Sequence, residues 1–122
     1  MTKKIRQLVY EKYEGHCAYC GMLIHINNMQ VDHIKPKRNF SIDKRKGYQY
    51  LVDIDDLDNL NPSCGGCNNF KSAMSLDEFR SELQKQVERA RRYSVNFRLA
   101  EKYKQIQIFE FPIKFYFETH GE

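Results

Sequence analysis

Four cysteines arranged in two pairs form the clearest chemical pattern in this sequence. Both pairs have the spacing Cys-x-x-Cys, with Cys17 and Cys20 in the first and Cys64 and Cys67 in the second. Two such pairs in one short chain are typical of a tetrahedral site where four thiolates bind one zinc ion. Soft, anionic sulfur ligands favour zinc and leave no open coordination position. We therefore predict a structural Zn²⁺ site that joins the two pairs.

Two other interpretations of the cysteines stay open. They could form a redox dithiol or remain as buried thiols, although neither pair opens the apolar βαβ unit of a thioredoxin-like motif. His16 and His25 lie close to the first pair and could replace a thiolate. One zinc ion per chain with unreactive thiols would exclude the redox interpretation.

A second group of polar residues lies between the cysteine pairs and just after the second pair. Asp32 and His33 end a short apolar run before Pro36. Asn68 and Lys71 are three residues apart and share a face if they are helical. Phosphodiester cleavage needs a base for water, oxygen ligands for a metal ion and a cation for phosphate, which this set supplies. In the alternative, Asp32 and His33 only make local hydrogen bonds at a strand end.

Local patterns predict the elements that would position these groups. Apolar residues at helical spacing follow Thr2, which is the expected cap of a helix, and Gly15 stands where that helix would end. The predicted elements up to the second cysteine pair are a helix over about 5–13, a strand over 29–34, a long and partly ordered loop over 37–56, a strand over 57–60 and a short helix from about Cys67.

The C-terminal part begins with the capping-box pattern from Ser75 to Glu78. It predicts a helix to about Arg92, followed by a second helix over about 96–105. The β-branched and aromatic tail over 106–117 predicts one or two strands interrupted by Pro112. We therefore predict one α+β domain over 1–122, with a core at about 16–72 and a helical and β extension at 75–118.

The charge balance restricts the function only weakly. Lys and Arg total 20 against 16 Asp and Glu, which gives a net charge of +4. Basic residues crowd 35–46 and acidic residues crowd 53–58. No apolar run is long enough for a signal peptide or a membrane span, so we expect a cytoplasmic protein that does not bind membranes.

Two features of the C-terminal part each have more than one interpretation. The cations of the predicted long helix could follow a nucleic-acid backbone or simply face solvent; they are Arg80, Lys85, Arg89, Arg91 and Arg92. The aromatic tail could stack on bases, close the core as an edge strand, or form a subunit interface with a protein partner or a second copy.

In its landmarks and their order, the sequence resembles the HNH endonuclease family, which has the ββα-metal (His-Me finger) fold. The landmarks are Cys17-x-x-Cys20, then Val31-Asp32-His33-Ile34-x-Pro36, then Asn59-Leu60-x-Pro62-x-Cys64-x-x-Cys67-Asn68-x-x-Lys71. The resemblance covers residues from about 16 to 72 and implies a metal-dependent nuclease that cuts DNA, most simply double-stranded DNA, leaving a 5′ phosphate and a 3′ hydroxyl.

The resemblance also implies roles for individual residues. His33 corresponds to the general base that activates water, and Asn59 to the asparagine that steadies the loop carrying that histidine. Asp32 and Asn68 correspond to the ligands of one catalytic divalent ion, and the four cysteines to a structural zinc set. The residues expected to contact nucleic acid are Lys35, Lys37, Arg38 and Lys71.

One position departs from the pattern of many family members, which have histidine where this chain has Asn68. An amide oxygen in place of an imidazole nitrogen makes the ligand set harder, which favours Mg²⁺ or Mn²⁺ over zinc. A different interpretation of the whole pattern is a catalytically silent, zinc-stabilised module that binds nucleic acid or protein. The joint presence of Asp32, His33, Asn59 and Asn68 argues against it.

Overall fold

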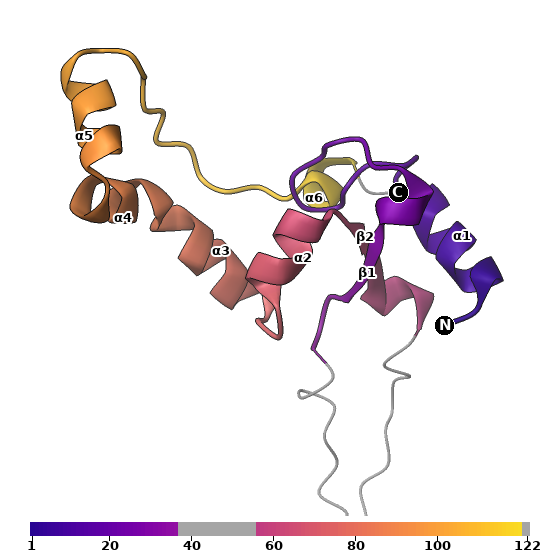
Figure 1. Ribbon diagram of the computed structural model, residues 1–122. Helices are drawn as coiled ribbons and strands as arrows, with labels where there is room; N and C mark the ends of the chain where they lie inside the picture. The colour runs from indigo at the N-terminus through magenta and orange to yellow at the C-terminus, as the bar shows by residue number, and fades with distance from the viewer. Residues whose placement is uncertain (37–55, 121–122) are drawn as a thin grey trace, which may run out of the picture.

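The computed structural model describes residues 1–36 and 56–120 of the 122-residue chain (Figure 1). The loop predicted for 37–56 lies outside the described residues, apart from Asp56. No helix within the described residues is both long and apolar enough to cross a bilayer. The elements in chain order are α1 (Lys3–Glu11), η1 (Ile26–Asn28), β1 (Gln30–His33), η4 (Leu57–Asn59), β2 (Leu60–Ser63), α2 (Gly65–Lys71), α3 (Leu76–Gln84), α4 (Gln86–Tyr93), α5 (Val95–Lys102) and α6 (Tyr116–His120).

The centre of the fold is a two-stranded antiparallel sheet followed by a short helix. β1 pairs with β2 in a register that runs from Gln30 opposite Ser63 to His33 opposite Leu60. The next helix, α2, lies alongside β1 (Figure 1). This strand–strand–helix order is that of the ββα-metal fold, and it confirms the predicted α+β class.

The N-terminal helix α1 covers the sheet and contributes to an aliphatic core. As predicted, Thr2 caps this helix, because its hydroxyl accepts a hydrogen bond of 3.2 Å from the backbone of Ile5. Val9 is the buried residue of α1, and it packs with the buried side chains of Ile24, Met29 and Leu60.

A second, aromatic core joins residues that are far apart in the sequence. Tyr19 of the first cysteine segment packs edge-to-face on Phe79 of α3 and Phe115 of the tail, with ring centroids 5.4 and 5.2 Å apart. Edge-to-face contacts of this kind stabilise the packing beyond the area they bury. The aromatic core therefore attaches the C-terminal extension to the cysteine segment.

The second strand differs from the prediction for 57–60. Residues 57–59 form the 3₁₀ helix η4, because the side chain of Asp56 accepts a hydrogen bond from Asp58 and starts a tight turn. The strand β2 begins at Leu60 and includes Pro62. Proline is tolerated there because its backbone points away from β1, as shown by its carbonyl, which accepts a hydrogen bond of 2.8 Å from Ala18, so its missing N–H removes no hydrogen bond between the strands.

The single helix predicted from Ser75 to about Arg92 was wrong in its length. The capping box of Ser75 and Glu78 is present, but α3 ends at Gln84 and α4 starts at Gln86. The carbonyl of Glu82 accepts hydrogen bonds from the Lys85 backbone and the Gln86 side chain, which closes a tight turn at this point. The next predicted helix is α5, and the side chain of Ser94 caps it.

The strands predicted for the tail over 106–117 were also wrong. Residues 107–115 have no regular secondary structure, and α6 begins at Tyr116. The tail instead returns to the cysteine segment (Figure 1), where the backbones of Tyr116 and Phe117 donate to the carbonyls of Tyr19 and Ala18. A high β-propensity does not make a strand where no neighbouring strand offers its backbone.

Candidate metal centre and active site

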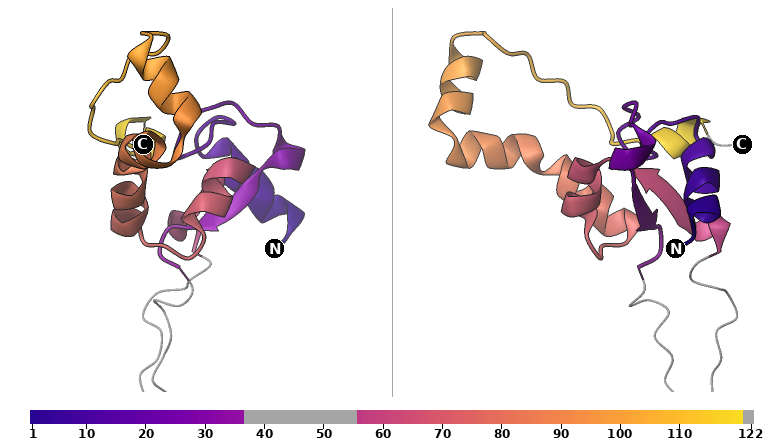
Figure 2. Two further views of the ribbon diagram at one scale, coloured as in Figure 1. Left: turned by 60° about the vertical axis from the view of Figure 1, so that its left-hand side comes forward. Right: turned by 45° about the vertical axis from the view of Figure 1, so that its right-hand side comes forward.

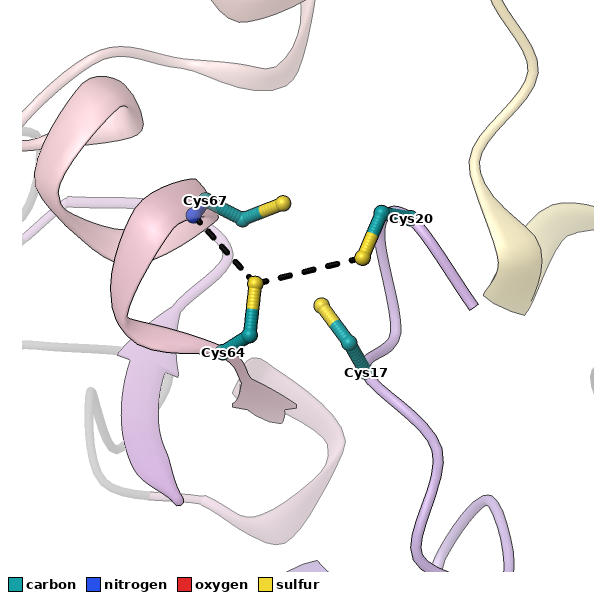
Figure 3. Close-up of side chains that lie close together, drawn as sticks. All are labelled: Cys17, Cys20, Cys64 and Cys67. Carbon is teal, nitrogen blue, oxygen red and sulfur yellow. Dashed lines mark hydrogen bonds between the residues drawn. The ribbon is translucent and has the colours of Figure 1, made fainter. Parts of the chain in front are cut away.

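The four cysteines converge on one point of the structure. Their sulfur atoms all lie within 4.8 Å of one another, and the Sγ atoms of Cys20 and Cys64 are 3.9 Å apart (Figure 3). All four are free of disulfides. The cluster thus has the number, type and spacing of ligands that a metal ion such as zinc requires.

Two local structures carry the sulfur ligands. The first pair lies on a tight turn in which Gly21 adopts a φ of +81° and donates a hydrogen bond to the Cys17 carbonyl. The second pair lies at the start of α2, where the sulfur of Cys64 caps the helix by accepting a hydrogen bond of 3.4 Å from the backbone of Cys67.

The thiols are polarised against one another. A hydrogen bond from the Cys67 thiol lowers the pKa of Cys17 to about 4, while the same bond and burial raise the pKa of Cys67. Burial also raises the pKa of Cys20. A bound soft divalent cation would favour the thiolate form of these ligands.

The histidines considered as alternative ligands are occupied elsewhere. His16 stacks on Tyr116 with ring centroids 5.0 Å apart, and its Nδ1 lies 3.0 Å from the Tyr13 carbonyl. His25 caps η1 by accepting a hydrogen bond from the backbone of Asn27. Neither belongs to the sulfur cluster, so the ligand set consists of the four cysteines.

Next to the cluster, the end of β1 contains a buried charged group. Asp32 is 4% exposed and forms an ion pair with the fully buried Lys71 of α2, with Nζ 3.1 and 3.2 Å from the two carboxylate oxygens. The hydroxyl of Tyr19 donates a very short hydrogen bond to the same carboxylate. Burial raises the pKa of Asp32, and the contacts from Tyr19 and Lys71 oppose that rise.

Lys71 also contacts the residue that carries the predicted base. Its ammonium donates a hydrogen bond of 2.9 Å to the backbone carbonyl of His33. The side chain of His33 is half-buried, at the last position of β1. Lys71, predicted above to bind nucleic acid, therefore does not present its ammonium to solvent, because the fold uses its donors internally.

Asn59 holds the segment that follows His33. Its buried carboxamide accepts a hydrogen bond of 2.9 Å from the Lys35 backbone and donates one of 3.3 Å to the Lys35 carbonyl. Its own carbonyl accepts from the backbone of Ile34. These three bonds fix the turn directly after β1.

The remaining predicted residues are distributed as follows. Asn68 is half-buried on α2, one turn before Lys71 and on the same helix face. Since Lys71 contacts Asp32, that face is directed at the end of β1. Lys35 is exposed, whereas Lys37 and Arg38 lie outside the described residues.

Sequence patterns missed two residues that organise this site. Tyr19, inside the first cysteine pair, links the Asp32 carboxylate to the aromatic core. Lys12, after α1, donates hydrogen bonds of 3.0 and 2.8 Å to the carbonyls of Leu57 and Leu60, on either side of Asn59. No spacing rule identifies either residue, because each acts through the tertiary fold.

Comparison with known proteins gives a family match and similarity to a solved structure. The model of the HNH endonuclease family matches residues 17–73. No curated protein sequence matches significantly. Among solved structures, the Type II-C Cas9 enzyme from Actinomyces naeslundii is similar, with a TM-score of 0.47 and 23% identity over 80% of this chain and 10% of that one. The family resemblance seen in the sequence is confirmed by this match to the HNH endonuclease family, which covers residues 17–73, a little under half of the chain.

Proposed function

We propose that this chain is a metal-dependent endonuclease that hydrolyses DNA phosphodiester bonds with His33 as the general base. The observation that carries the proposal is the ion pair between Asp32 and Lys71. It holds α2, which carries Asn68, against β1, which carries Asp32 and His33, and this contact supports the assignment of the three residues to one site.

In the proposed reaction, His33 takes a proton from a water molecule. The water oxygen then bonds to phosphorus, and the bond from phosphorus to the 3′ oxygen breaks. The 3′ oxygen takes up a proton, which leaves a 5′ phosphate and a 3′ hydroxyl. A half-buried imidazole at a strand end suits this role, because it can be held rigidly and still reach solvent.

The Asp32 carboxylate and the Asn68 amide oxygen would hold a hard divalent ion, either Mg²⁺ or Mn²⁺. When bound, such an ion stabilises the charge that builds on the phosphate oxygens. The carboxylate fits this role because an oxygen has two lone pairs, so its contacts with Lys71 and Tyr19 leave acceptor capacity.

We assign positioning roles to three residues that surround this group. Lys71 fixes both the Asp32 carboxylate and the His33 carbonyl, and Tyr19 fixes the carboxylate from the other side. Asn59 fixes the turn after His33. Such supporting hydrogen bonds orient a metal ligand and its neighbour, and their loss reduces metal affinity or activity.

The sulfur cluster would bind Zn²⁺ in a structural role. It joins the turn after α1 to the start of α2, which carries Asn68. Lys35, exposed next to the proposed base, would contact a phosphate of the DNA near the cleaved bond.

The test is cleavage of plasmid DNA by the purified protein with added Mg²⁺, compared with the His33→Ala variant. General-base catalysis contributes about 10²–10⁴-fold, so the variant should lose that much of the single-turnover rate. A matched control is His25→Ala, which changes an exposed histidine away from the site and should cut like the parent.

Metal dependence supplies a second readout. The parent should cut with Mg²⁺ or Mn²⁺, and adding only Zn²⁺ should not support cleavage. If His33→Ala cuts as fast as the parent, the assignment of the base is wrong. If neither protein cuts although both are folded and contain zinc, the silent-module interpretation replaces the nuclease.

A further inference from the structure

The segment over residues 85–104, here called the arm, differs in charge from the rest of the chain. It comprises α4, α5 and the residues next to them, and it lies away from the sheet (Figure 2). Seven of its side chains are Lys or Arg and two are Glu, which gives it a net charge of +5. Since the whole chain carries +4, all other residues together have a net negative charge.

Some of the arm's cations stabilise the arm itself. Arg91 of α4 forms an ion pair with Glu101 of α5, with Nη2 2.7 Å from Oε2 and a second hydrogen bond from Nε. Arg98 donates hydrogen bonds to the last carbonyls of α4. These contacts set the angle between the two helices and are internal to the arm.

Three other cations of the arm have no such internal role. Arg92, Lys102 and Lys104 are exposed, and none of them forms an ion pair with a carboxylate of the described residues. Arg92 and Lys102 lie in the last turns of α4 and α5, where a cation favours the helix end, but no carboxylate of the described residues balances the charge of the three. Their charge is available to an anionic partner.

Two tyrosines accompany these cations. Tyr93 and Tyr103 are 76% and 73% exposed, the highest values among the large hydrophobic side chains of the described residues. Tyr93 follows Arg92, whose guanidinium lies 5.6 Å from the ring centroid, and Tyr103 stands between Lys102 and Lys104. Exposed tyrosines among cations can donate to phosphates or stack on bases.

The surface of α4 is also hollowed where its basic side chains meet. A cavity of about 290 Å³ is lined by Lys85, Glu88, Arg89, Arg92 and Tyr93. The three cations among them follow helical spacing and share one face. Lys85 and Arg89 form ion pairs with Glu82, at 3.4 and 2.6 Å, so Arg92 is the lining cation that no carboxylate of the described residues balances. A concave surface with an exposed cation and an aromatic side chain suits a phosphate backbone better than it suits an apolar partner.

We propose that the arm is a second DNA-contacting surface, which binds the phosphate backbone at a distance from the reaction centre. This proposal rests on the nuclease function proposed above and extends it to binding. The arm reads no sequence, because phosphate contacts carry no sequence information. It lies beyond α3, whose nine residues span about 13 Å, so it would hold DNA that extends past the cleaved bond.

The experiment compares two variants with the same change in net charge. The arm variant is Arg92→Gln/Lys102→Gln/Lys104→Gln, and the matched control is Lys3→Gln/Lys4→Gln/Lys114→Gln, which removes three exposed cations elsewhere. The dissociation constant for a labelled DNA duplex is measured by fluorescence anisotropy over a range of salt concentrations, without added Mg²⁺. Circular dichroism and light scattering check folding and oligomeric state.

We expect the arm variant to bind about tenfold more weakly or worse. The slope of its log affinity against log salt concentration should fall by about 1 for each phosphate that the arm no longer neutralises. The control should change little, and the single-turnover rate at saturating protein should stay at the parent's value in both.

Equal reductions of affinity in the two variants, or unchanged affinity in both, would overturn the proposal. A change of oligomeric state with unchanged DNA binding would also overturn it, in favour of a protein interface. The DNA affinities are measured without cleavage. They therefore test the arm even if none of the proteins shows nuclease activity.

Discussion

The HNH segment over 17–73 and the extension after residue 75 hold their charged side chains in different environments. In the HNH segment, Asp32 and Lys71 pair with 4% and 0% of their side chains exposed. In the extension, Arg80 and Glu118 pair with 30% and 35% exposed, and Arg91 and Glu101 with 45% and 33%. Burial makes the first pair costly to break, whereas water screens the others.

The two regions are also stabilised by different means. The HNH segment has a strand pair of four residues each and depends on the sulfur cluster and on polar contacts around Asp32. The extension is attached through Phe79 and Phe115 of the aromatic core. We infer that loss of one polar group in the HNH segment affects fold and chemistry together, whereas the extension responds to single changes more weakly.

The largest effect should come from the sulfur cluster. Structural zinc contributes about 10–16 kcal/mol of apparent binding free energy in small domains, so Cys64→Ser should abolish zinc binding and cooperative unfolding of the HNH segment. Metal analysis and thermal unfolding followed by circular dichroism measure both. His25→Ala is the control and should retain one zinc ion per chain. A Cys64→Ser protein that unfolds like the parent would show that the cluster is not a structural metal site.

The next effect should come from the buried ion pair. Lys71→Met leaves the Asp32 carboxylate buried without its cation, which should lower the free energy of unfolding by about 3–5 kcal/mol. The exposed Lys114→Met is the matched control and should change stability little. Urea unfolding measures both variants. The double variant Asp32→Asn/Lys71→Met should be destabilised less than Lys71→Met, because it contains no uncompensated charge.

The same variant should show a pH dependence of known sign. Burial already raises the pKa of Asp32, and Lys71 opposes that rise, so Lys71→Met should raise this pKa further. A carboxyl with a raised pKa is neutral in acid and destabilises the fold once it ionises. The stability difference between parent and variant should therefore be smallest in acid and grow as the pH rises. A difference that does not change with pH would show that weaker packing, rather than charge, causes the effect.

A smaller effect on stability, with a clear effect on chemistry, should follow from Asn59→Ala. The change leaves the Lys35 backbone without its two side-chain hydrogen bonds, at a cost of about 1–3 kcal/mol. Because these bonds fix the turn after His33, the single-turnover rate with Mg²⁺ should fall while DNA binding persists. Asn59→Asp keeps the acceptor for the Lys35 backbone but sets a carboxylate oxygen against the Lys35 carbonyl, so it should not recover the stability. An unchanged rate would mean that the turn does not position the base.

The sequence predicted well wherever a motif has its own local geometry. Thr2 and Ser75 cap their helices as expected, and the two Cys-x-x-Cys turns bring their sulfur atoms together. Predictions failed where a local turn or a tertiary contact that no sequence pattern marks decided the outcome. The helix breaks at Lys85 because the Glu82 carbonyl is bonded in a tight turn, and the tail is no strand because it binds the cysteine segment instead.

The candidate site shows the same division. The spacing pattern selected Asp32 and Lys71, which do meet across β1 and α2. It could not show that the Lys71 ammonium is fully enclosed, since burial depends on the packing of all neighbouring elements. Tyr19 was missed for the same reason: its contact with Asp32 exists only once the first cysteine turn has folded against β1.

The smallest expected effect concerns the exposed ion pair of the extension. Nη1 and Nη2 of Arg80 donate to Glu118, at 2.9 and 2.8 Å, and Arg80 lowers the pKa of Glu118 below its ordinary value of 4.5. A carboxyl with a lowered pKa stabilises the fold above its unfolded-state pKa, and this stabilisation disappears as the pH falls through the folded-state value. Arg80→Gln should lower stability by about 1 kcal/mol or less at neutral pH, because exposed pairs contribute little.

The difference in stability between Arg80→Gln and the parent should shrink in acid, where Glu118 is protonated in both proteins. Hydrogen exchange of the α6 amides at several pH values would measure it. If Arg80→Gln instead destabilised the protein as much as Lys71→Met, the contrast between the two regions would be wrong.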